Sequence, residues 1–231
     1  MTNGSPACKT HPDIVAFTHP LLHFRDSLRR QRKTRIVALG SSSTAGANAV
    51  LPFPGRLEFL LRQGQFGRLI DVVNRGIGGQ ESPEELSRFE CDVLAEDPAL
   101  VIWQVGTNAV FHSDCYNPDE VEAAIRIGLE LLAGRPTDVV LMDLQYTAAM
   151  VSDPAKLKLS EAIENRIAKL AANANVNLFK RWELMKTWCR VDNVALADLD
   201  DKGEFNLHMS EWATACMTQA LHDAIVSAPA A

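Results

Sequence analysis

The 231-residue sequence lacks the features that mark membrane-spanning, secreted and nucleic-acid-binding proteins. No uninterrupted apolar run approaches the roughly 18 residues of a membrane-spanning helix. The N-terminal segment MTNGSPACKTHPDIVAF has no apolar core of the kind found in signal peptides. Positive charge is not in excess, because the formal net charge is −6, which argues against a nucleic-acid-binding surface. We expect no membrane span and no nucleic-acid partner.

The cysteines show no pairing pattern. Their number is odd, they are widely spaced, and no Cys-x-x-Cys motif occurs among Cys8, Cys91, Cys115, Cys189 and Cys216. This pattern argues against a disulfide framework and against a zinc site, and it is typical of a reducing compartment. Together with the missing signal peptide, it predicts a cytoplasmic location.

Neither of the common nucleotide-binding loops is present. The segment GSSSTAGAN has the wrong glycine spacing for a P-loop and lacks its lysine. The segment GIGGQE supplies Gly76 and Gly78 of a dinucleotide-binding loop but has Glu81 in place of the third glycine. We therefore expect no cofactor. The one basic run is interpreted as the solvated end of a helix, and it consists of Arg29, Arg30, Arg32, Lys33 and Arg35.

What the sequence does contain is a regular alternation of apolar runs and helical patterns. The apolar runs lie at 35–40, 69–74, 99–106, 138–144 and 175–179, and they suit strands of a parallel sheet that is buried on both faces. Helical patterns lie at 54–63, 82–97, 117–134, 155–174 and about 209–226. The expected fold class is α/β, a three-layer α/β/α domain over residues 35–231 with a five-stranded parallel, flavodoxin-like sheet. Residues 1–34 are expected to form an N-terminal arm and helix.

Two of the expected helices have recognisable starts. Ser82 is the expected N-cap of one helix, with Pro83 in the first turn and Glu85 three residues after the cap. Asn117 and Pro118 begin the next helix in the same way.

Polar or glycine-rich turns follow the first three expected strands. These turns read GSSSTAG after the first strand, NRGIGG after the second and GTNA after the third. Each one alone has an ordinary interpretation as a loop. The carboxyl ends of parallel strands, however, share one edge of the sheet, where active sites of such folds lie. We therefore expect the three turns to meet at a functional site.

Taken together, these turns resemble the sequence blocks of the SGNH hydrolases, the GDSL-type esterase and lipase superfamily. GSSSTAG resembles the first block, NRGIGG the second and GTNA the third, and NLHMSEW resembles the last block, in which a histidine opens the final helix. The four blocks occur in the family order and cover residues 35 to about 226. The resemblance implies an SGNH hydrolase fold and a serine ester hydrolase with no metal or cofactor.

The resemblance also assigns site residues. With Gly40 and Gly46 as the first and last glycines of the first block, Ser42 takes the position of the nucleophile, and Ser41 takes the position usually held by aspartate. His208 takes the position of the general base. The oxyanion hole would consist of the backbone N–H groups of Ser42 and Gly79 and the side-chain amide of Asn108.

The triad acid does not follow from the resemblance, because Phe205 stands where the family acid usually stands. Glu204 is the nearest carboxylate and is the predicted acid, while Asp201, Asp200 and a backbone carbonyl are the alternatives. Against Glu204, Phe205 and Leu207 are expected to be buried, which would turn Glu204 to solvent.

The substrate is expected to be a small-molecule ester with a small or medium acyl group. The loop DLQYTAAMVSDP follows the fourth expected strand, and Gln145, Tyr146 and Met150 are its candidate substrate-binding residues. The alternative function is a non-catalytic binding module on the same fold, one that has lost its triad acid.

Overall fold

The computed structural model describes residues 6–30, 33–64, 69–203 and 205–230. At its centre lies a five-stranded parallel sheet with the strand order β2-β1-β3-β4-β5. The strands are β1 (Lys33–Gly40), β2 (Leu69–Gly76), β3 (Leu100–Gln104), β4 (Asp138–Met142) and β5 (Asn177–Phe179). This is the order of flavodoxin-like sheets, so the predicted fold class is confirmed.

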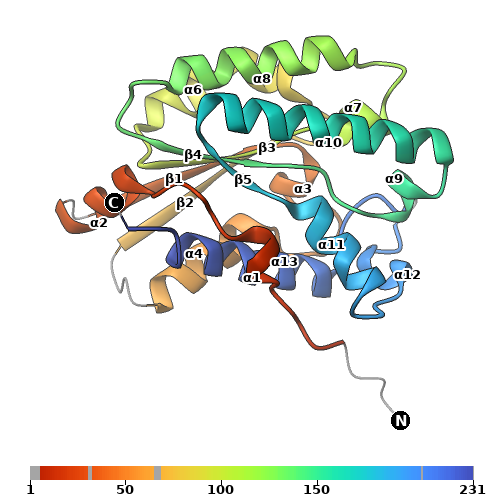
Figure 1. Cartoon of the computed structure of the whole chain (residues 1–231). Helices are drawn as coiled ribbons and strands as arrows, with labels where there is room; N and C mark the ends of the chain where they lie inside the picture. Colours follow the sequence, from red (N-terminus) through yellow and green to blue (C-terminus); the bar gives the residue numbers. More distant parts are fainter. Residues whose placement is uncertain (1–5, 31–32, 65–68, 204, 231) are drawn as a thin grey trace.

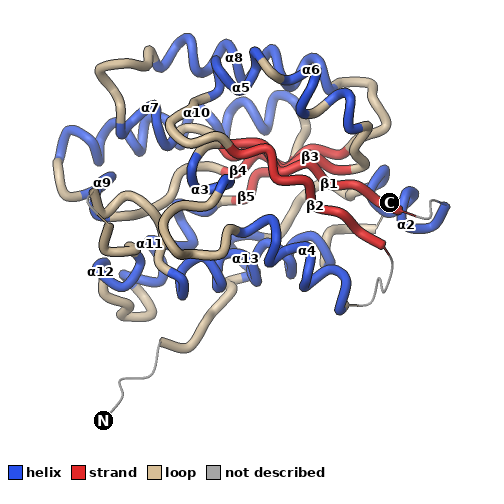
Figure 2. The backbone as a smooth tube through the Cα atoms, turned by 180° about the vertical axis from the view of Figure 1, so that it is seen from behind, coloured by secondary structure: helices blue, strands red, loops and turns tan. Residues whose placement is uncertain are grey.

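Helices cover both faces of the sheet (Figures 1 and 2). One layer contains α1 (Pro12–Val15), α2 (Leu22–Arg30), α4 (Phe53–Gln63), α11 (Arg181–Arg190) and α13 (Glu211–Val226). The other layer contains α5 (Ser82–Ser87), α6 (Phe89–Asp92), α7 (Thr107–Phe111), α8 (Pro118–Leu132) and α10 (Pro154–Ala174). The remaining short helices are α3 (Ser42–Ala45), α9 (Ala148–Val151), α12 (Leu196–Leu199) and a 3₁₀ turn at Leu94–Glu96.

The strands are apolar along their length because both faces of the sheet are covered. In β1, Ile36 and Ala38 pack into the core beneath α4 and α13, whereas Val37 and Leu39 pack into the core beneath α8 and α10. Side chains of a strand alternate between the two faces, so a strand buried on both sides needs apolar residues at every position.

One predicted helix cap is correct and the other is shifted by one residue. The Asn117 side chain accepts the Asp119 N–H at 2.9 Å, as an N-cap does. Helix α5 is capped by Glu81 and not by Ser82. The Ser82 hydroxyl is buried and donates to the Val121 carbonyl of α8 at 3.0 Å, so packing between helices takes the group that the local pattern assigned to the cap.

The N-terminal arm is joined to α11 and α13. The indole N–H of Trp188 donates to the Lys9 carbonyl at 2.7 Å, and that of Trp212 donates to the Pro6 carbonyl at 2.8 Å. Cys8 forms a disulfide with Cys216 of α13. The expectation of unpaired cysteines is therefore wrong for this pair, because the fold brings together two residues that are 208 positions apart. The cytoplasmic location stays a prediction.

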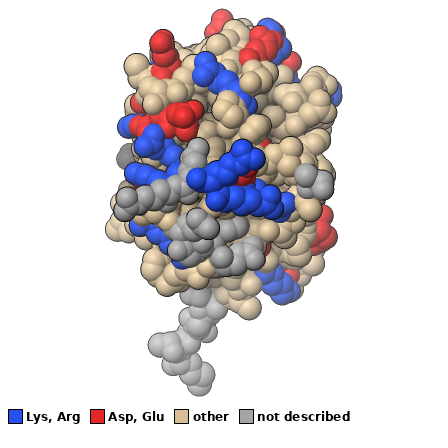
Figure 3. All heavy atoms as spheres, turned by 90° about the vertical axis from the view of Figure 1, so that its left-hand side faces the viewer, with Lys and Arg blue, Asp and Glu red and all other residues tan. Residues whose placement is uncertain are grey.

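Lys and Arg side chains gather on the side of the molecule where the strands begin (Figure 3). Part of the basic run lies there and is paired: Arg30 with Asp26 at 2.7 Å, Lys33 with Asp71, and Arg35 with Glu96 at 3.2 Å. Arg29 and Arg30 are exposed at the end of α2, as predicted, and Arg32 lies outside the described residues. Within the described chain, no helix combines the length and apolar character needed to cross a membrane.

Candidate active site

The turn that carries Ser42 is held at the carboxyl end of β1. Ser42 begins α3, so its backbone N–H is one of the N-terminal groups that no carbonyl within the helix accepts. The Asn74 side chain, at the end of β2, donates to the Thr44 carbonyl at 2.8 Å. Gly76 lies against α3 so closely that a Cβ there would be 2.1 Å from the Ala45 nitrogen. Packing against α3 alone therefore accounts for Asn74 and Gly76 of the NRGIGG turn.

Gln104 is a site residue that the sequence analysis missed. It ends β3, is buried, and its side-chain oxygen accepts the backbone N–H and the hydroxyl of Ser41 at 3.1 and 3.0 Å. It also accepts the Thr44 hydroxyl at 3.3 Å. Gln104 therefore joins β3 to the turn on both sides of Ser42. The signal for it was a single amide in the otherwise apolar strand LVIWQ.

Ser42 and His208 are brought together although they are 166 positions apart in the chain. The Ser42 Oγ and the His208 Nε2 lie 2.9 Å apart, within hydrogen-bond distance. His208 lies just before α13, whose N-cap Ser210 binds the Ala213 N–H at 3.1 Å through its hydroxyl. The imidazole is half-buried, and this burial lowers the pKa of His208 while the nearby Asp201 charge partly offsets the effect. A lowered pKa favours the neutral imidazole, which is the form that can accept a proton.

Asp201 is the carboxylate beside His208 in the described part of the chain. Its Oδ2 lies 3.8 Å from the His208 Nδ1, which is longer than a hydrogen bond but within reach of an ion pair. The Asp201 backbone N–H donates to the His208 carbonyl at 2.9 Å, and Asp200 and Met209 form an antiparallel bridge. Because of this pairing, an acid seven positions before the histidine lies beside the ring.

The other candidate acids differ in their positions. Glu204, the predicted acid, lies outside the described residues. The Asp200 carboxylate accepts the Ala148 N–H at 3.3 Å, and burial raises the pKa of this group to about 6. The expectation that Phe205 is buried is wrong, since Phe205 is 56% exposed and contacts Phe111 edge-on. Leu207 is buried, as expected.

Gly79 and Asn108 lie on adjacent loops, after β2 and β3, and a Cβ on the neighbouring Gly78 would lie 3.8 Å from the Ser42 Cβ. Gly79 has a φ of +80°, a conformation that glycine adopts without a steric penalty. Its carbonyl accepts the Tyr116 hydroxyl at 2.9 Å, and burial raises the Tyr116 pKa to about 12, so the hydroxyl stays a donor. One N–H of the Asn108 amide donates to the Gln80 carbonyl at 2.7 Å. Because a side-chain amide has two donors, the second N–H remains for a ligand.

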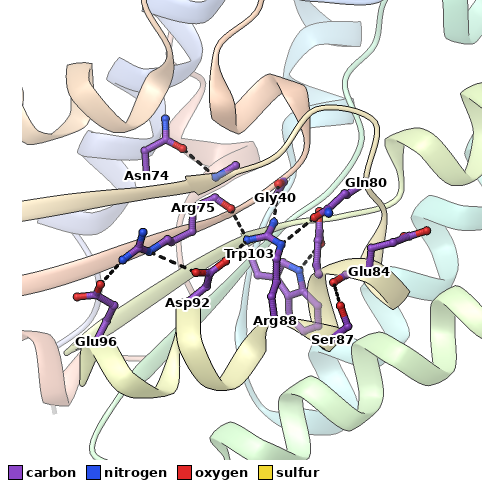
Figure 4. A network of polar contacts seen from close by, with 12 residues as sticks. Gly40, Asn74, Arg75, Gln80, Glu84, Ser87, Arg88, Asp92, Glu96 and Trp103 are labelled. Atoms are coloured by element: carbon purple, nitrogen blue, oxygen red, sulfur yellow. Dashed lines mark hydrogen bonds and ion pairs between the residues drawn. The ribbon is translucent and has the colours of Figure 1, made fainter.

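Arg88 contacts the loop that contains Gly79 through the side chain of Gln80 (Figure 4). Its guanidinium donates to the Gln80 side chain at 2.7 Å, to the Arg75 carbonyl at 2.8 Å and to the Gly40 carbonyl at 3.3 Å. Arg88 therefore connects the loop that contains Gly79 to the end of β1, immediately before the serine turn. Its planar fork of donors suits three acceptors on different segments.

The loop after β4 packs inward. Gln145 is fully buried, and its amide donates to the Leu207 carbonyl, next to His208, at 2.5 Å. Tyr146 packs edge-on against Trp182 with ring centroids 4.9 Å apart, and Met150 is also buried. Gln145 therefore supports the His208 loop. Contact of Gln145 or Tyr146 with substrate stays a prediction.

The hollow beside His208 is small. A hollow of about 20 Å³ lies between the serine turn and the start of α13, lined by Ser43, Gly46, Ala47, Val50, Pro52, His208, Met209 and Thr214. This is room for about one water molecule. In the described part of the chain, no group of three or more His, Cys, Asp or Glu side chains is placed to hold a metal ion.

Solved structures with the same fold include an ester hydrolase. Axe2, an acetylxylan esterase from Geobacillus stearothermophilus, aligns with a TM-score of 0.71 and 18% sequence identity, over 83% of this chain and 94% of Axe2. LAE5, an alpha/beta hydrolase enzyme from the metagenome of Lake Arreo, aligns with a TM-score of 0.70 and 16% identity, over 85% of this chain and 97% of LAE5. The SGNH hydrolase fold implied by the four sequence blocks is confirmed.

Sequence comparisons give a partial relative and a family. A curated relative, described as uncharacterized lipoprotein YqeF of Bacillus subtilis, is 36% identical over 76 residues, which are 32% of this chain and 31% of that protein. One family model, described as the Non-GDSL lipase-like family, matches the chain. Because residues 7–231 match this model, the chain belongs to the Non-GDSL lipase-like family.

Proposed function

We propose that this protein is a serine ester hydrolase that cleaves small or medium acyl esters through an acyl-enzyme. The observation that carries the proposal is the 2.9 Å contact between the Ser42 Oγ and the His208 Nε2 at the carboxyl edge of the sheet. A nucleophile and a base within hydrogen-bond reach are the signature of covalent catalysis by serine. Asn108 and Gly79 supply donors on the neighbouring loops.

In the proposed reaction, His208 Nε2 accepts the Ser42 proton while Oγ attacks the ester carbonyl carbon. The backbone N–H groups of Ser42 and Gly79 and the free N–H of the Asn108 amide stabilise the tetrahedral oxyanion. The imidazolium then protonates the leaving alcohol, and the acyl group stays on Ser42. Water gives one proton to His208 and attacks the carbonyl carbon of the acyl-enzyme. The acid leaves as the imidazolium returns that proton to the Ser42 Oγ, which restores the serine hydroxyl and the neutral histidine.

Asp201 is the proposed partner of the His208 Nδ1. A triad carboxylate orients the imidazole and stabilises the imidazolium that forms. The Asp201 carboxylate is itself held by the Gly203 N–H at 2.9 Å and by the Asn48 side-chain amide. The Asp201 carboxylate beside His208 supports the hydrolase over the binding-module alternative, which rested on Phe205 at the usual acid position.

Small acyl groups are favoured by the shape of the site. The hollow beside His208 is too small for a long acyl chain. Exposed apolar side chains border the site, namely Leu51 next to the hollow, Ile77 in the loop before Gly79, and Phe205 before His208. These side chains offer a surface for a medium chain or for an apolar alcohol. We expect p-nitrophenyl acetate and butyrate to be turned over faster than the octanoate ester.

The direct test is steady-state hydrolysis of p-nitrophenyl acetate by the wild-type protein. The proposal predicts saturable turnover with no added metal. A protein that binds the ester without turning it over would favour the binding module, and a protein that does neither would remove both functions.

The pH dependence should follow His208. Because protonated His208 cannot accept the Ser42 proton, kcat/KM is expected to fall as the pH decreases through the His208 pKa. Burial lowers that pKa from 6.5, so the midpoint should lie below 6.5. The Asp201→Asn variant removes the charge that raises the pKa, so its midpoint should be lower still. The measurement is kcat/KM from about pH 4 to about pH 9, which reports on the free enzyme. A wild-type midpoint above 6.5 would contradict this assignment.

Replacing Asn108 by alanine should reduce catalysis without weakening substrate binding. We expect kcat to fall roughly 100- to 1,000-fold, the usual cost of one oxyanion donor, while KM changes little. Tyr116→Phe is the control, since it removes a bond to the Gly79 carbonyl but no oxyanion donor. It should lose less than about tenfold in kcat. An Asn108→Ala variant that changes only KM would assign Asn108 to substrate binding.

A further inference from the structure

A fully buried carboxylate lies directly after the loop that contains Gly79. Glu81 caps α5, is only 1% exposed, and belongs to none of the four sequence blocks. In the sequence, Glu81 stands out only as the residue in place of the third glycine of a dinucleotide-binding loop. Burial of a carboxylate costs free energy unless hydrogen bonds compensate. The hydrogen-bond partners of Glu81 therefore indicate which part of the structure it stabilises.

Those partners come from two different loops. The Glu81 Oε1 accepts the Gly106 N–H at 2.9 Å and the Ser82 N–H at 3.0 Å, and its Oε2 accepts the Ala109 N–H at 3.0 Å. Gly106 and Ala109 lie on either side of Asn108 at the start of α7. The carboxylate therefore connects the loop after β2 to the turn after β3 by two bonds.

The same two loops carry two of the three proposed oxyanion donors. Gly79 lies two residues before Glu81. Asn108 lies between Gly106 and Ala109, whose backbone N–H groups donate to the Glu81 carboxylate. The Asn108 amide also donates to the Gln80 carbonyl, so any shift between the loops would move both donors relative to Ser42. Gly79 itself is exposed and lies in an open turn, which leaves Glu81 as the buried anchor nearest to it.

We propose that Glu81 is a positioning residue that holds the Gly79 N–H and the Asn108 amide in one oxyanion hole. This inference rests on the proposed esterase function and extends it to a residue that does not touch the substrate. Oxyanion donors contribute only when they point at the place where charge develops, so the effect of Glu81 should appear in kcat.

If Glu81 acted through its charge and not by positioning the donors, Glu81→Gln would change kcat in the opposite direction. A negative charge near the site disfavours an oxyanion, so a purely electrostatic role predicts that Glu81→Gln raises kcat. A positioning role predicts that it lowers kcat, because glutamine keeps one acceptor and places an NH₂ group against an N–H donor. The direction of the change therefore separates the two.

Glu85 provides a matched control on the same helix. It is also a buried carboxylate, but its hydrogen bond comes from the Trp103 indole N–H at 2.7 Å, and its other oxygen has no partner among the described residues. Burial and the neighbouring Glu81 charge raise the Glu85 pKa well above its usual range, so glutamine imitates its neutral form. Glu85→Gln should therefore leave the oxyanion loops undisturbed.

The experiment compares kcat, KM and thermal unfolding of the wild type, Glu81→Gln and Glu85→Gln with p-nitrophenyl acetate. We expect kcat to fall roughly 10- to 100-fold in Glu81→Gln, less than for loss of a donor, with KM within about threefold of wild type. Glu85→Gln should keep kcat within about threefold, even if its unfolding temperature drops equally. If Glu81→Gln does not fold, Glu81→Asp against Glu85→Asp provides the same comparison.

Two results would overturn the inference. Equal kcat losses in the Glu81 and Glu85 variants would make Glu81 a structural cap, and an increase in kcat for Glu81→Gln would make its role electrostatic. An inactive wild-type protein would instead refute the proposed function, and the inference with it.

Discussion

Ser42→Ala is expected to abolish ester hydrolysis while leaving the folded structure and its stability unchanged. Loss of the nucleophile removes the acyl-enzyme route, and comparable changes in serine hydrolases cost about 10⁶-fold in kcat. The measurements are p-nitrophenyl acetate turnover and thermal unfolding by circular dichroism.

The adjacent serines provide controls for this variant. The Ser43 hydroxyl is buried and has no hydrogen-bond partner among the described residues, so Ser43→Ala should keep kcat within about threefold of wild type. Ser41 is bonded to Gln104, so Ser41→Ala should lower stability more than chemistry. An inactive Ser41→Ala together with an active Ser42→Ala would move the nucleophile to Ser41.

Asp201→Asn should have the second largest effect. Asparagine keeps the shape of Asp201 but removes the charge that stabilises the imidazolium, and in serine triads this change costs about 10⁴-fold in kcat. Because the Asp201 Oδ2 and the His208 Nδ1 lie 3.8 Å apart, we expect a loss of roughly 10²- to 10⁴-fold, within that limit. The measurement is kcat at a pH well above the His208 midpoint, where the base is neutral in both proteins.

Glu204→Gln and Asp200→Asn are the controls for the triad acid. Glu204→Gln should be nearly silent if Asp201 is the partner of His208. Asp200→Asn should change stability, because the Asp200 carboxylate holds the Ala148 N–H. A silent Asp201→Asn with a crippled Glu204→Gln would restore the prediction made from the sequence.

The architecture was predictable because the sheet is covered on both faces. Val101, Ile102 and Trp103 of β3 are all apolar. A continuous apolar run is typical of a parallel strand buried on both faces, whereas a half-exposed strand alternates apolar and polar residues. The N-cap of α5 was not predictable from the local pattern, because the Ser82 hydroxyl donates instead to the Val121 carbonyl of α8, 39 positions away in the sequence. The Cys8–Cys216 disulfide was not predictable either, because its two cysteines are 208 positions apart and meet only when the N-terminal arm packs on α13.

The site was predictable where it depends on strand ends. Ser42, Gly79 and Asn108 each follow a strand, and parallel strands bring such residues to one edge. The position of Asp201, the proposed triad acid, depends instead on the bridge between Asp200 and Met209, which brings a residue seven positions before His208 next to it. Glu81 and Gln104 were missed because their roles consist of contacts between loops. A buried glutamate or glutamine in an apolar setting is the signal that could have identified them.

The most direct test of the account is to label the wild-type protein with a fluorophosphonate and to locate the adduct by tandem mass spectrometry. Phosphonylation requires a nucleophilic serine with a working base, so it reports on the Ser42–His208 pair independently of the natural substrate. Trypsin places all three serines of the turn in one peptide, from Ile36 to Arg56. The account predicts one adduct, on Ser42, that is absent in His208→Ala. Absence of labelling in the folded wild-type protein, or an adduct on Ser41 or Ser43, would contradict it.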